Sequence, residues 1–290
     1  MPFLIRSKTV RRRTRGAWQQ VGLVAGFLAG RHFVGANDLH YGYWNDDIEL
    51  KVRNLPEAQE EYCRFLLNHI PVPADAKRIL DVGCGAGGVA SKLVARGHEV
   101  DCVSPSGFLN SQAKARLGNR VRIFESKYED FNTTETYDAV MFCESFQYVK
   151  MEVSLDKAIS QLRPGGSLII CDFFRNADEL GSPISGGHRI NEFQAVVARY
   201  PLRLVEEIDI TAKTAPTFTV IDSAFTEVLQ PIWDEVDAAT KANHPWIFKA
   251  YNWFFSKKLA KVKKKYFSHD RSAENFQKFK TYRFMRFERR

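Results

Sequence analysis

Cysteine is scarce in this sequence, and no two cysteines have the spacing of a metal or redox site. Five cysteines occur in 290 residues, and none belongs to a C-x-x-C motif. Four of them lie in apolar segments of strand length, which is typical of reduced core residues. Metal-ligand spacing, a P-loop and a nucleophile elbow are also absent from the sequence. We therefore expect a cytoplasmic protein that binds no metal ion.

Long apolar runs are absent as well. The run Val21–Ala29 follows a cluster of arginines, but it is shorter than the about 20 residues that a membrane-spanning helix needs. No A-x-A-like cleavage site follows it, which argues against a signal peptide. Two interpretations stay open: an amphipathic arm that lies on the body or on a membrane, and a packed N-terminal helix.

Acidic residues are nearly absent from both ends of the chain. Residues 1–15 hold six basic residues and no acidic one, and residues 246–290 hold fourteen against three, whereas the whole chain carries a net charge of +8. The body between the two ends is therefore acidic. A nucleic-acid binder more often carries its charge on the core fold, so this distribution favours docking to a surface and predicts no specific nucleic-acid partner.

Strand-like and helix-like segments alternate through the central part of the sequence. Apolar runs of strand length occupy Arg78–Gly83, Glu99–Ser104, Val121–Glu125, Tyr137–Cys143, Ser167–Phe174 and Leu202–Ile210. Helical periodicity occupies Gly88–Arg96, Leu109–Leu117, Glu152–Leu162 and Asn191–Arg199. This alternation predicts an α/β fold with a doubly wound, mostly parallel sheet and helices on both faces. Between the third helix and the fifth strand, RPGG (Arg163–Gly166) predicts a tight turn.

A seventh strand is predicted at the end of the chain. Phe279–Arg289 alternates aromatic and basic residues, which is the period of a strand. A long helical stretch separates it from the sixth strand. The sequence therefore predicts a seven-stranded sheet with a helical insertion before its last strand.

A glycine-rich segment follows the first predicted strand. Gly83–Gly88, GCGAGG, satisfies the pattern G-x-G-x-x-G and precedes a predicted helix. Glycines let a ligand approach the backbone, and the helix N-terminus offers free N–H groups to polar or anionic atoms. Nicotinamide-dependent oxidoreductases share this pattern and stay an alternative. Those enzymes place an acid on the ribose, whereas the second predicted strand here ends in Ser104.

Three segments in series, LDVGCGAG, YDAVMFCESFQYV and LRPGGSLII, resemble the class I S-adenosylmethionine-dependent methyltransferases. The resemblance covers Ile79 to about Phe174 in order and spacing. It implies a Rossmann-like fold and S-adenosyl-L-methionine as the cofactor. Within that class the pattern is nearest to the cyclopropane-fatty-acid synthases and the mycolic-acid and tocopherol methyltransferases. The first two groups also carry a hydroxyl residue in place of the ribose acid.

The resemblance implies a set of cofactor contacts. Asp81 would fix the glycine turn and the cofactor's amino group, and Ser104 would accept one ribose hydrogen bond. KYEDF would place Tyr128 against the adenine, with Glu129 accepting from its amino group. The full set is His40, Tyr41, Asp81, Gly83, Cys84, Gly85, Ser104, Pro105, Tyr128, Glu129 and Cys143.

The methyl acceptor is predicted to lie beside two further segments. DLHYGYW (Asp38–Trp44) resembles the H-x-G-Y-[YW] segment of lipid-type and tocopherol methyltransferases; its aromatics would exclude water from the reacting groups, or they form part of the core. Glu144 and Tyr148 follow the fourth predicted strand, and His188 follows the fifth. These three are candidate catalytic bases, with structural roles as the alternative.

Trp246–Phe267 predicts an amphipathic helix with aromatics on one side and lysines at its far end. Such a helix fits an anionic membrane surface, or it is a lid over the acceptor pocket. We expect four parts: a basic arm and cofactor-closing segment at 1–50, a cofactor-binding core at 51–216, a helical lid at 217–268, and the closing strand at 269–290.

We predict methyl transfer from S-adenosylmethionine to a hydrophobic small molecule, such as a lipid, a quinone-like ring or a polyketide-type acceptor. The basic ends would suit a peripheral position at the inner membrane surface. Two alternatives stay open: a nicotinamide-dependent oxidoreductase, and a catalytically silent member of the fold that binds a membrane or a partner. The sequence gives no indication of the oligomeric state.

Overall fold

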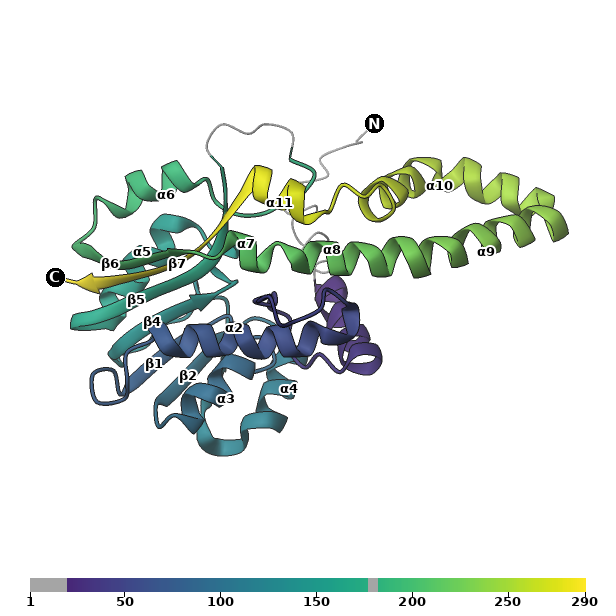
Figure 1. The fold of residues 1–290 in the computed structure, drawn as a ribbon. Coiled ribbons are helices and arrows are strands. Elements are labelled where there is room, and N and C mark those ends of the chain that lie inside the picture. The colour runs from purple at the N-terminus through teal and green to yellow at the C-terminus, as the bar shows by residue number, and fades with distance from the viewer. Residues whose placement is uncertain (1–19, 177–181) are drawn as a thin grey trace, which may run out of the picture.

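A seven-stranded sheet forms the centre of the protein, in the order β3-β2-β1-β4-β5-β7-β6 (Figure 1). The structure is a computed structural model, and it describes residues 20–176 and 182–290. The strands are β1 (Arg78–Val82), β2 (Glu99–Ser104), β3 (Arg122–Glu125), β4 (Tyr137–Cys143), β5 (Leu162–Arg175), β6 (Leu202–Asp209) and β7 (Lys280–Arg289). β1 to β5 pair in parallel, and β7 runs antiparallel to both β5 and β6. The predicted mostly parallel, seven-stranded sheet is confirmed.

Helices cover both faces of the sheet because the central strands are apolar on both sides. One hydrophobic core lies under α2 (Leu55–His69), α3 (Gly88–Ala95) and α4 (Gly107–Leu117). A second core lies under α5 (Met151–Gln161) and α6 (Ile190–Val197). Successive residues of β1 alternate between the two cores, Ile79 facing the first and Leu80 the second.

The predicted turn at Arg163–Gly166 belongs to the beginning of a strand. α5 ends at Gln161 and β5 begins at Leu162. The pairing with β4 continues through Tyr137↔Leu162 and then shifts to Ala139↔Ser167. Gly165 adopts φ 76° within this irregularity. Proline and glycine therefore form a bulge in the strand, because the backbone already pairs with β4 at this point.

The helical insertion before the last strand is confirmed. After β6 the chain forms α7 (Thr211–Thr214), α8 (Pro216–Ser223), η5 (Ala224–Leu229), α9 (Gln230–Asn243), α10 (Pro245–Tyr266) and α11 (Ala273–Phe279). α9 and α10 lie side by side as a hairpin that projects away from the sheet (Figure 1). None of the helices in the described part of the chain is both long and apolar enough to cross a membrane.

The segment before α2 is packed on the body. Residues 20–29 are helical and continue into η1 (Gly30–Val34). Phe27 is buried against Ala86 of the glycine turn and Leu109 of α4, and its ring lies 6.0 Å from that of Phe108. The packed helix is therefore the interpretation that the structure supports for this run. The basic cluster within residues 1–15 lies outside the described residues.

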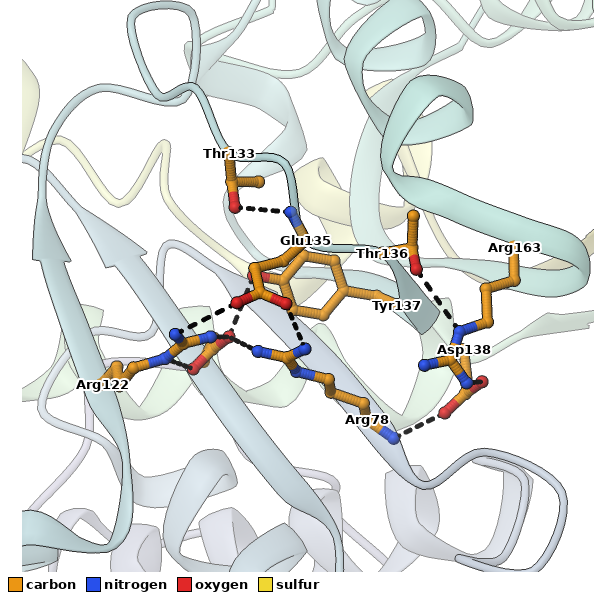
Figure 2. Close-up of polar contacts among 9 residues, drawn as sticks. Arg78, Arg122, Thr133, Glu135, Thr136, Tyr137, Asp138 and Arg163 are labelled. Atoms are coloured by element: carbon orange, nitrogen blue, oxygen red, sulfur yellow. Dashed lines mark hydrogen bonds and ion pairs between the residues drawn. The ribbon is translucent and has the colours of Figure 1, made fainter.

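Charged side chains join the strands at the amino edge of the sheet. Figure 2 shows Arg78, Arg122, Glu135 and Tyr137 converging there. Asp101 of β2 is buried among them and accepts hydrogen bonds from Arg122 at 2.8 Å and from the Tyr137 hydroxyl at 2.9 Å. Burial alone would raise the pKa of Asp101, but these hydrogen bonds outweigh it and lower the pKa. Asp101 is therefore a structural carboxylate at the edge opposite the glycine turn and does not supply the missing ribose acid.

Candidate active site

The glycine turn joins β1 to α3 with three glycines in the left-handed region. Gly83, Gly85 and Gly87 have φ of 82°, 55° and 80°. A Cβ at Gly83 would lie 2.4 Å from Cβ of Ser145, so this position needs glycine for close packing. At Gly85 a Cβ would meet no atom within 4 Å. The turn therefore packs closely against Ser145 at Gly83 and leaves open space at Gly85. A ligand can approach the backbone at Gly85.

Asp81 lies at the end of β1, beneath this turn. Its side chain is buried, and its Oδ2 has no hydrogen-bond partner among the described residues. Burial raises its pKa to about 7. A buried carboxyl oxygen without a partner is costly. A bound ammonium group would remove that cost, and the amino group of S-adenosylmethionine fits this requirement.

Ser104, at the end of β2, is buried and makes few polar contacts. Its Oγ accepts a weak hydrogen bond from the Ser106 amide at 3.4 Å, and Pro105 beside it is exposed. Asn110 of α4 donates to the Ser104 carbonyl at 3.1 Å, while its own Oδ1 has no partner in the described residues. Sequence reasoning missed Asn110, although a polar residue at an inward helical position was a detectable signal.

Tyr128 does not occupy the position that the sequence predicted. Its ring is buried in the second core and packs edge-on against Phe142, with centroids 5.2 Å apart. Its hydroxyl donates to Gln161 Oε1 at 2.7 Å. These contacts point the ring into the protein, so it does not fit an adenine contact. Glu129 lies in the turn after β3 and is partly exposed, which leaves it accessible to a ligand.

Glu144 lies just beyond β4 in an unusual backbone conformation. It has φ 54°, which is uncommon for a residue with a side chain. Its Oε1 accepts hydrogen bonds from the Tyr41 amide at 2.7 Å and from the Tyr282 hydroxyl at 2.8 Å. Burial raises the pKa of Glu144 to about 8, although both hydrogen bonds oppose the shift. Strained backbone that the surrounding structure holds in place is often found at functional sites.

A chain of hydrogen bonds leads from Glu144 into the core. The Tyr282 hydroxyl, on β7, lies 2.9 Å from the Tyr62 hydroxyl, on α2. Tyr62 in turn lies 3.2 Å from Sγ of Cys171. Sequence reasoning missed both tyrosines. Cys143, predicted as a cofactor contact, is the last residue of β4 and pairs with Cys171 across the sheet.

Asp172 is a second buried carboxyl near Glu144. Its oxygens accept from the Gln147 amide at 3.0 Å and from the Gln147 side chain at 3.1 Å. Burial raises its pKa to about 7, against the effect of these hydrogen bonds. Tyr148, the predicted base beside this turn, is 66% exposed.

The DLHYGYW segment (Asp38–Trp44) packs over the carboxyl end of β4, where Glu144 lies. The Tyr41 ring stacks on Phe173 at 6.1 Å and meets Phe218 of α8 edge-on at 5.1 Å. His40 stacks on Tyr62 at 4.7 Å, and burial lowers its pKa. Tyr41 and Phe218 also line a cavity of about 90 Å³. The segment thus brings Glu144, two stacked rings and a small cavity together.

His188 has a different environment from the predicted one. Its Nε2 lies 3.1 Å from the Phe146 carbonyl and 2.9 Å from the Val149 carbonyl. A nitrogen between two carbonyl oxygens acts as a donor. His188 therefore holds the Phe146–Val149 turn and is not a base at the acceptor site. In the described part of the chain, no group of three or more His, Cys, Asp and Glu side chains could hold a metal ion.

The comparisons with known proteins agree with this geometry. Residues 79–166 match the family described as a methyltransferase domain. The chain is 27% identical over 229 residues to the methyltransferase GfsG of Streptomyces halstedii, across 71% of this chain and 80% of the relative.

Residues 79–166 of this chain are therefore a methyltransferase domain.

Two further similarities are partial or concern the fold alone. An uncharacterized methyltransferase of Mycobacterium tuberculosis is 31% identical over 40% of this chain and 46% of its own length. The fold is shared with a geranyl diphosphate C-methyltransferase of Streptomyces coelicolor, with a TM-score of 0.64 and 17% identity over 90% of this chain and 93% of that one. The nicotinamide oxidoreductase alternative gains no support from the fold or from the matched methyltransferase domain.

The raised pKa of Glu144 predicts how the protein loses stability as pH rises. The folded protein keeps this proton up to about pH 8, whereas the unfolded chain loses it near the ordinary value of 4.5. Between these values the unfolded state binds fewer protons, so stability falls as pH rises, by at most about 1.4 kcal/mol per pH unit. Glu144→Gln removes this dependence, so the variant gains stability relative to the wild type from pH 5 to pH 8.

Urea denaturation of the cofactor-free protein at pH 5 and at pH 8 measures the free energy of unfolding of Glu144→Gln and of the wild type. The exposed Glu152 of α5 provides the matched control, and Glu152→Gln is expected to differ from the wild type by a constant amount. A constant difference for Glu144→Gln as well would show that Glu144 does not hold its proton.

Proposed function

We propose that this protein transfers a methyl group from S-adenosylmethionine to a hydrophobic small molecule bound beneath Tyr41. The observation that carries this proposal is the position of Glu144. Its carboxyl group is fixed by two hydrogen bonds at the carboxyl edge of the sheet, where ligands of open α/β sheets bind. Tyr41, whose amide donates to Glu144, also lines a small cavity together with Phe218.

The cofactor would lie over the glycine turn. Its methyl group on a positively charged sulfur supplies the chemistry of the reaction. Gly83, Cys84 and Gly85 would contact it through the backbone, Asp81 would bind the amino group, and Ser104 with Asn110 would receive the ribose. The partnerless oxygens of Asp81 and Asn110 support this arrangement.

Glu144 would accept the proton of a hydroxyl, enol or phenol acceptor. Its pKa near 8 suits proton transfer around neutral pH, since a base works best when its pKa lies near the working pH. The Tyr282 hydroxyl donates a hydrogen bond to Glu144 and would stabilise the carboxylate form that takes up the proton. Tyr41, Phe173 and Phe218 exclude water, which favours transfer to the acceptor over reaction with solvent.

Gly85→Trp tests the cofactor site. The indole would project into the open side of the turn, where no atom lies within 4 Å of a Cβ. Binding of S-adenosylhomocysteine should fall below detection by titration calorimetry. Gly118→Trp is a matched control, because Gly118 also has a positive φ, of 61°, with no atom within 4 Å, but lies at the far end of α4.

Both glycines have a positive φ, so each substitution strains the backbone by roughly 1–3 kcal/mol, and thermal unfolding of the two variants measures that cost separately from cofactor binding. Unchanged affinity in Gly85→Trp would refute the assignment of the turn as the cofactor site.

Transfer of labelled methyl from S-adenosylmethionine into a cell extract tests the activity itself. Label should enter the organic phase, and Glu144→Gln should lower the rate by on the order of 10²-fold or more, the usual contribution of a general base. Glu152→Gln should keep the wild-type rate. Label in the aqueous phase alone would contradict a hydrophobic acceptor. No label in either phase, from protein that binds S-adenosylhomocysteine, would favour the catalytically silent alternative.

We further propose that α10 docks on an anionic membrane, at the inner surface. Three large aromatic side chains of this helix are exposed: Trp246 at 72%, Trp253 at 75% and Phe254 at 72%. The exposed lysines Lys257, Lys258 and Lys261 follow within two turns. Exposed aromatics beside lysines attract anionic lipid, at about 1 kcal/mol per basic residue near the surface.

The double variant Trp253→Ser/Phe254→Ser should reduce co-sedimentation with phosphatidylglycerol vesicles, and the wild type should not sediment with neutral vesicles. Leu204→Ser/Val205→Ser is the control, since these β6 side chains are also exposed, at 47% and 37%, but lie outside the hairpin. Equal sedimentation of the aromatic variant and the wild type would contradict membrane docking. A change in oligomeric state instead would show that the helix joins two copies of the chain.

A further inference from the structure

The acceptor cavity contains one charged side chain whose role the methyl transfer leaves unexplained. The cavity has a volume of about 90 Å³. Its lining comes from four separate parts of the chain: the DLHYGYW segment, the loop after β5, α8 and the connection between α10 and α11. The lining residues are Tyr41, Pro183, Ile184, Ser185, Phe218 and Arg271.

Arg271 has no ionic partner among the residues that the structure describes. Its guanidinium lies 5.8 Å from the centre of the Phe218 ring and 6.0 Å from that of Tyr266. It makes no hydrogen bond or ion pair with any residue that the structure describes. A partly buried guanidinium keeps five N–H donors that ring contacts do not satisfy. This side chain is therefore positioned by the two rings and left free to bind an anion.

A second positively charged side chain packs against Phe173, the ring that stacks on Tyr41. Lys280, the first residue of β7, is 1% exposed and donates to the Gly186 carbonyl at 2.7 Å. Its ammonium group lies 5.6 Å from the ring of Phe173, which stacks on Tyr41. Burial, and then the charge of Arg175, lower its pKa to about 8, so it remains largely charged at neutral pH.

The nearby carboxyl groups do not cancel this positive charge. Glu144 is held by Tyr41 and Tyr282, and Asp172 by Gln147. Neither carboxyl forms an ion pair with Arg271. Burial raises the pKa of both groups, so both tend to hold their protons. Arg271 is therefore the charged side chain among the cavity's lining residues, and no described carboxyl group pairs with it.

We propose that the methyl acceptor carries an oxyanion, a carboxylate or a phosphate, that Arg271 binds. This inference rests on the proposed function and narrows its acceptor to a small molecule with an apolar ring or chain and one anionic group. The apolar part would lie against Tyr41 and Phe218, and the guanidinium would form two parallel hydrogen bonds to the anion. The reacting hydroxyl would then face Glu144.

Titration calorimetry on protein saturated with S-adenosylhomocysteine tests this proposal. The probes are benzoate and phenyl phosphate, with benzamide as the neutral analogue of benzoate. Benzoate or phenyl phosphate should bind at least about 10-fold more tightly than benzamide, because a charge-assisted hydrogen bond exceeds a neutral one by that much. The tighter of the two anions identifies the acceptor's acidic group.

Arg271→Gln should weaken anion binding by about 10-fold or more and leave benzamide unchanged, while Arg271→Lys should lie between. Lys278→Gln is the matched control, because it removes an exposed positive charge from the neighbouring helix α11. Binding of S-adenosylhomocysteine to each variant shows that it is folded.

Three outcomes would overturn the proposal: benzamide binding as tightly as both anions, unchanged anion affinity in Arg271→Gln, or no binding of either anion to protein that binds S-adenosylhomocysteine. A wild-type protein that fails to bind S-adenosylhomocysteine would instead refute the proposed function. The two failures are therefore distinguishable.

Discussion

The carboxyl group of Glu144 connects the three parts of the chain that build the site. It follows the central strand β4, accepts from the Tyr41 amide of the N-terminal segment, and accepts from the Tyr282 hydroxyl of the closing strand. These partners are 103 and 138 residues away in sequence. Glu144 keeps a left-handed backbone at a cost of about 1–2 kcal/mol. The two hydrogen bonds offset this cost, so this arrangement of Glu144 forms only when the sheet is complete.

Burial of carboxyl groups is the second constraint. Asp81, Glu144 and Asp172 all end up at the carboxyl edge with raised pKa values, whereas Asp101 at the amino edge has a lowered one. The difference lies in their partners. Asp101 is surrounded by arginines, which stabilise its charge. The three carboxyls of the site lack such partners, so the protein leaves their charge to be compensated by ligands or protons.

Much of the fold was predictable because it depends on local patterns. Alternating strands and helices, the glycine turn and the late closing strand all leave signals within about ten residues of sequence. The direction in which a side chain points leaves no such local signal. KYEDF suggested an adenine contact, yet Tyr128 turns inward because Gln161, 33 residues away, offers it a hydrogen bond. His188 looked like a free base, yet two carbonyl oxygens of the Phe146–Val149 turn hold its ring.

The residues that sequence reasoning missed share one property: their partners lie on other elements. Tyr62 and Tyr282 are ordinary apolar-face positions of a helix and a strand until the sheet brings their hydroxyls within 2.9 Å. Arg271 is one basic residue among many near the C-terminus, and only the packing of α11 against α8 within the insertion places it in a cavity.

The insertion therefore has two chemically different ends. The hairpin exposes aromatics and lysines far from the sheet, while the return toward β7 places Arg271 over the Phe218 ring, in a small cavity that Tyr41 also lines. The two proposals select for the same kind of molecule, because an anionic membrane surface and an anion site beside aromatic rings both suit an amphiphile with an acidic group. Under these proposals one insertion supplies both the surface where such a molecule binds and the contact that orients it for methylation.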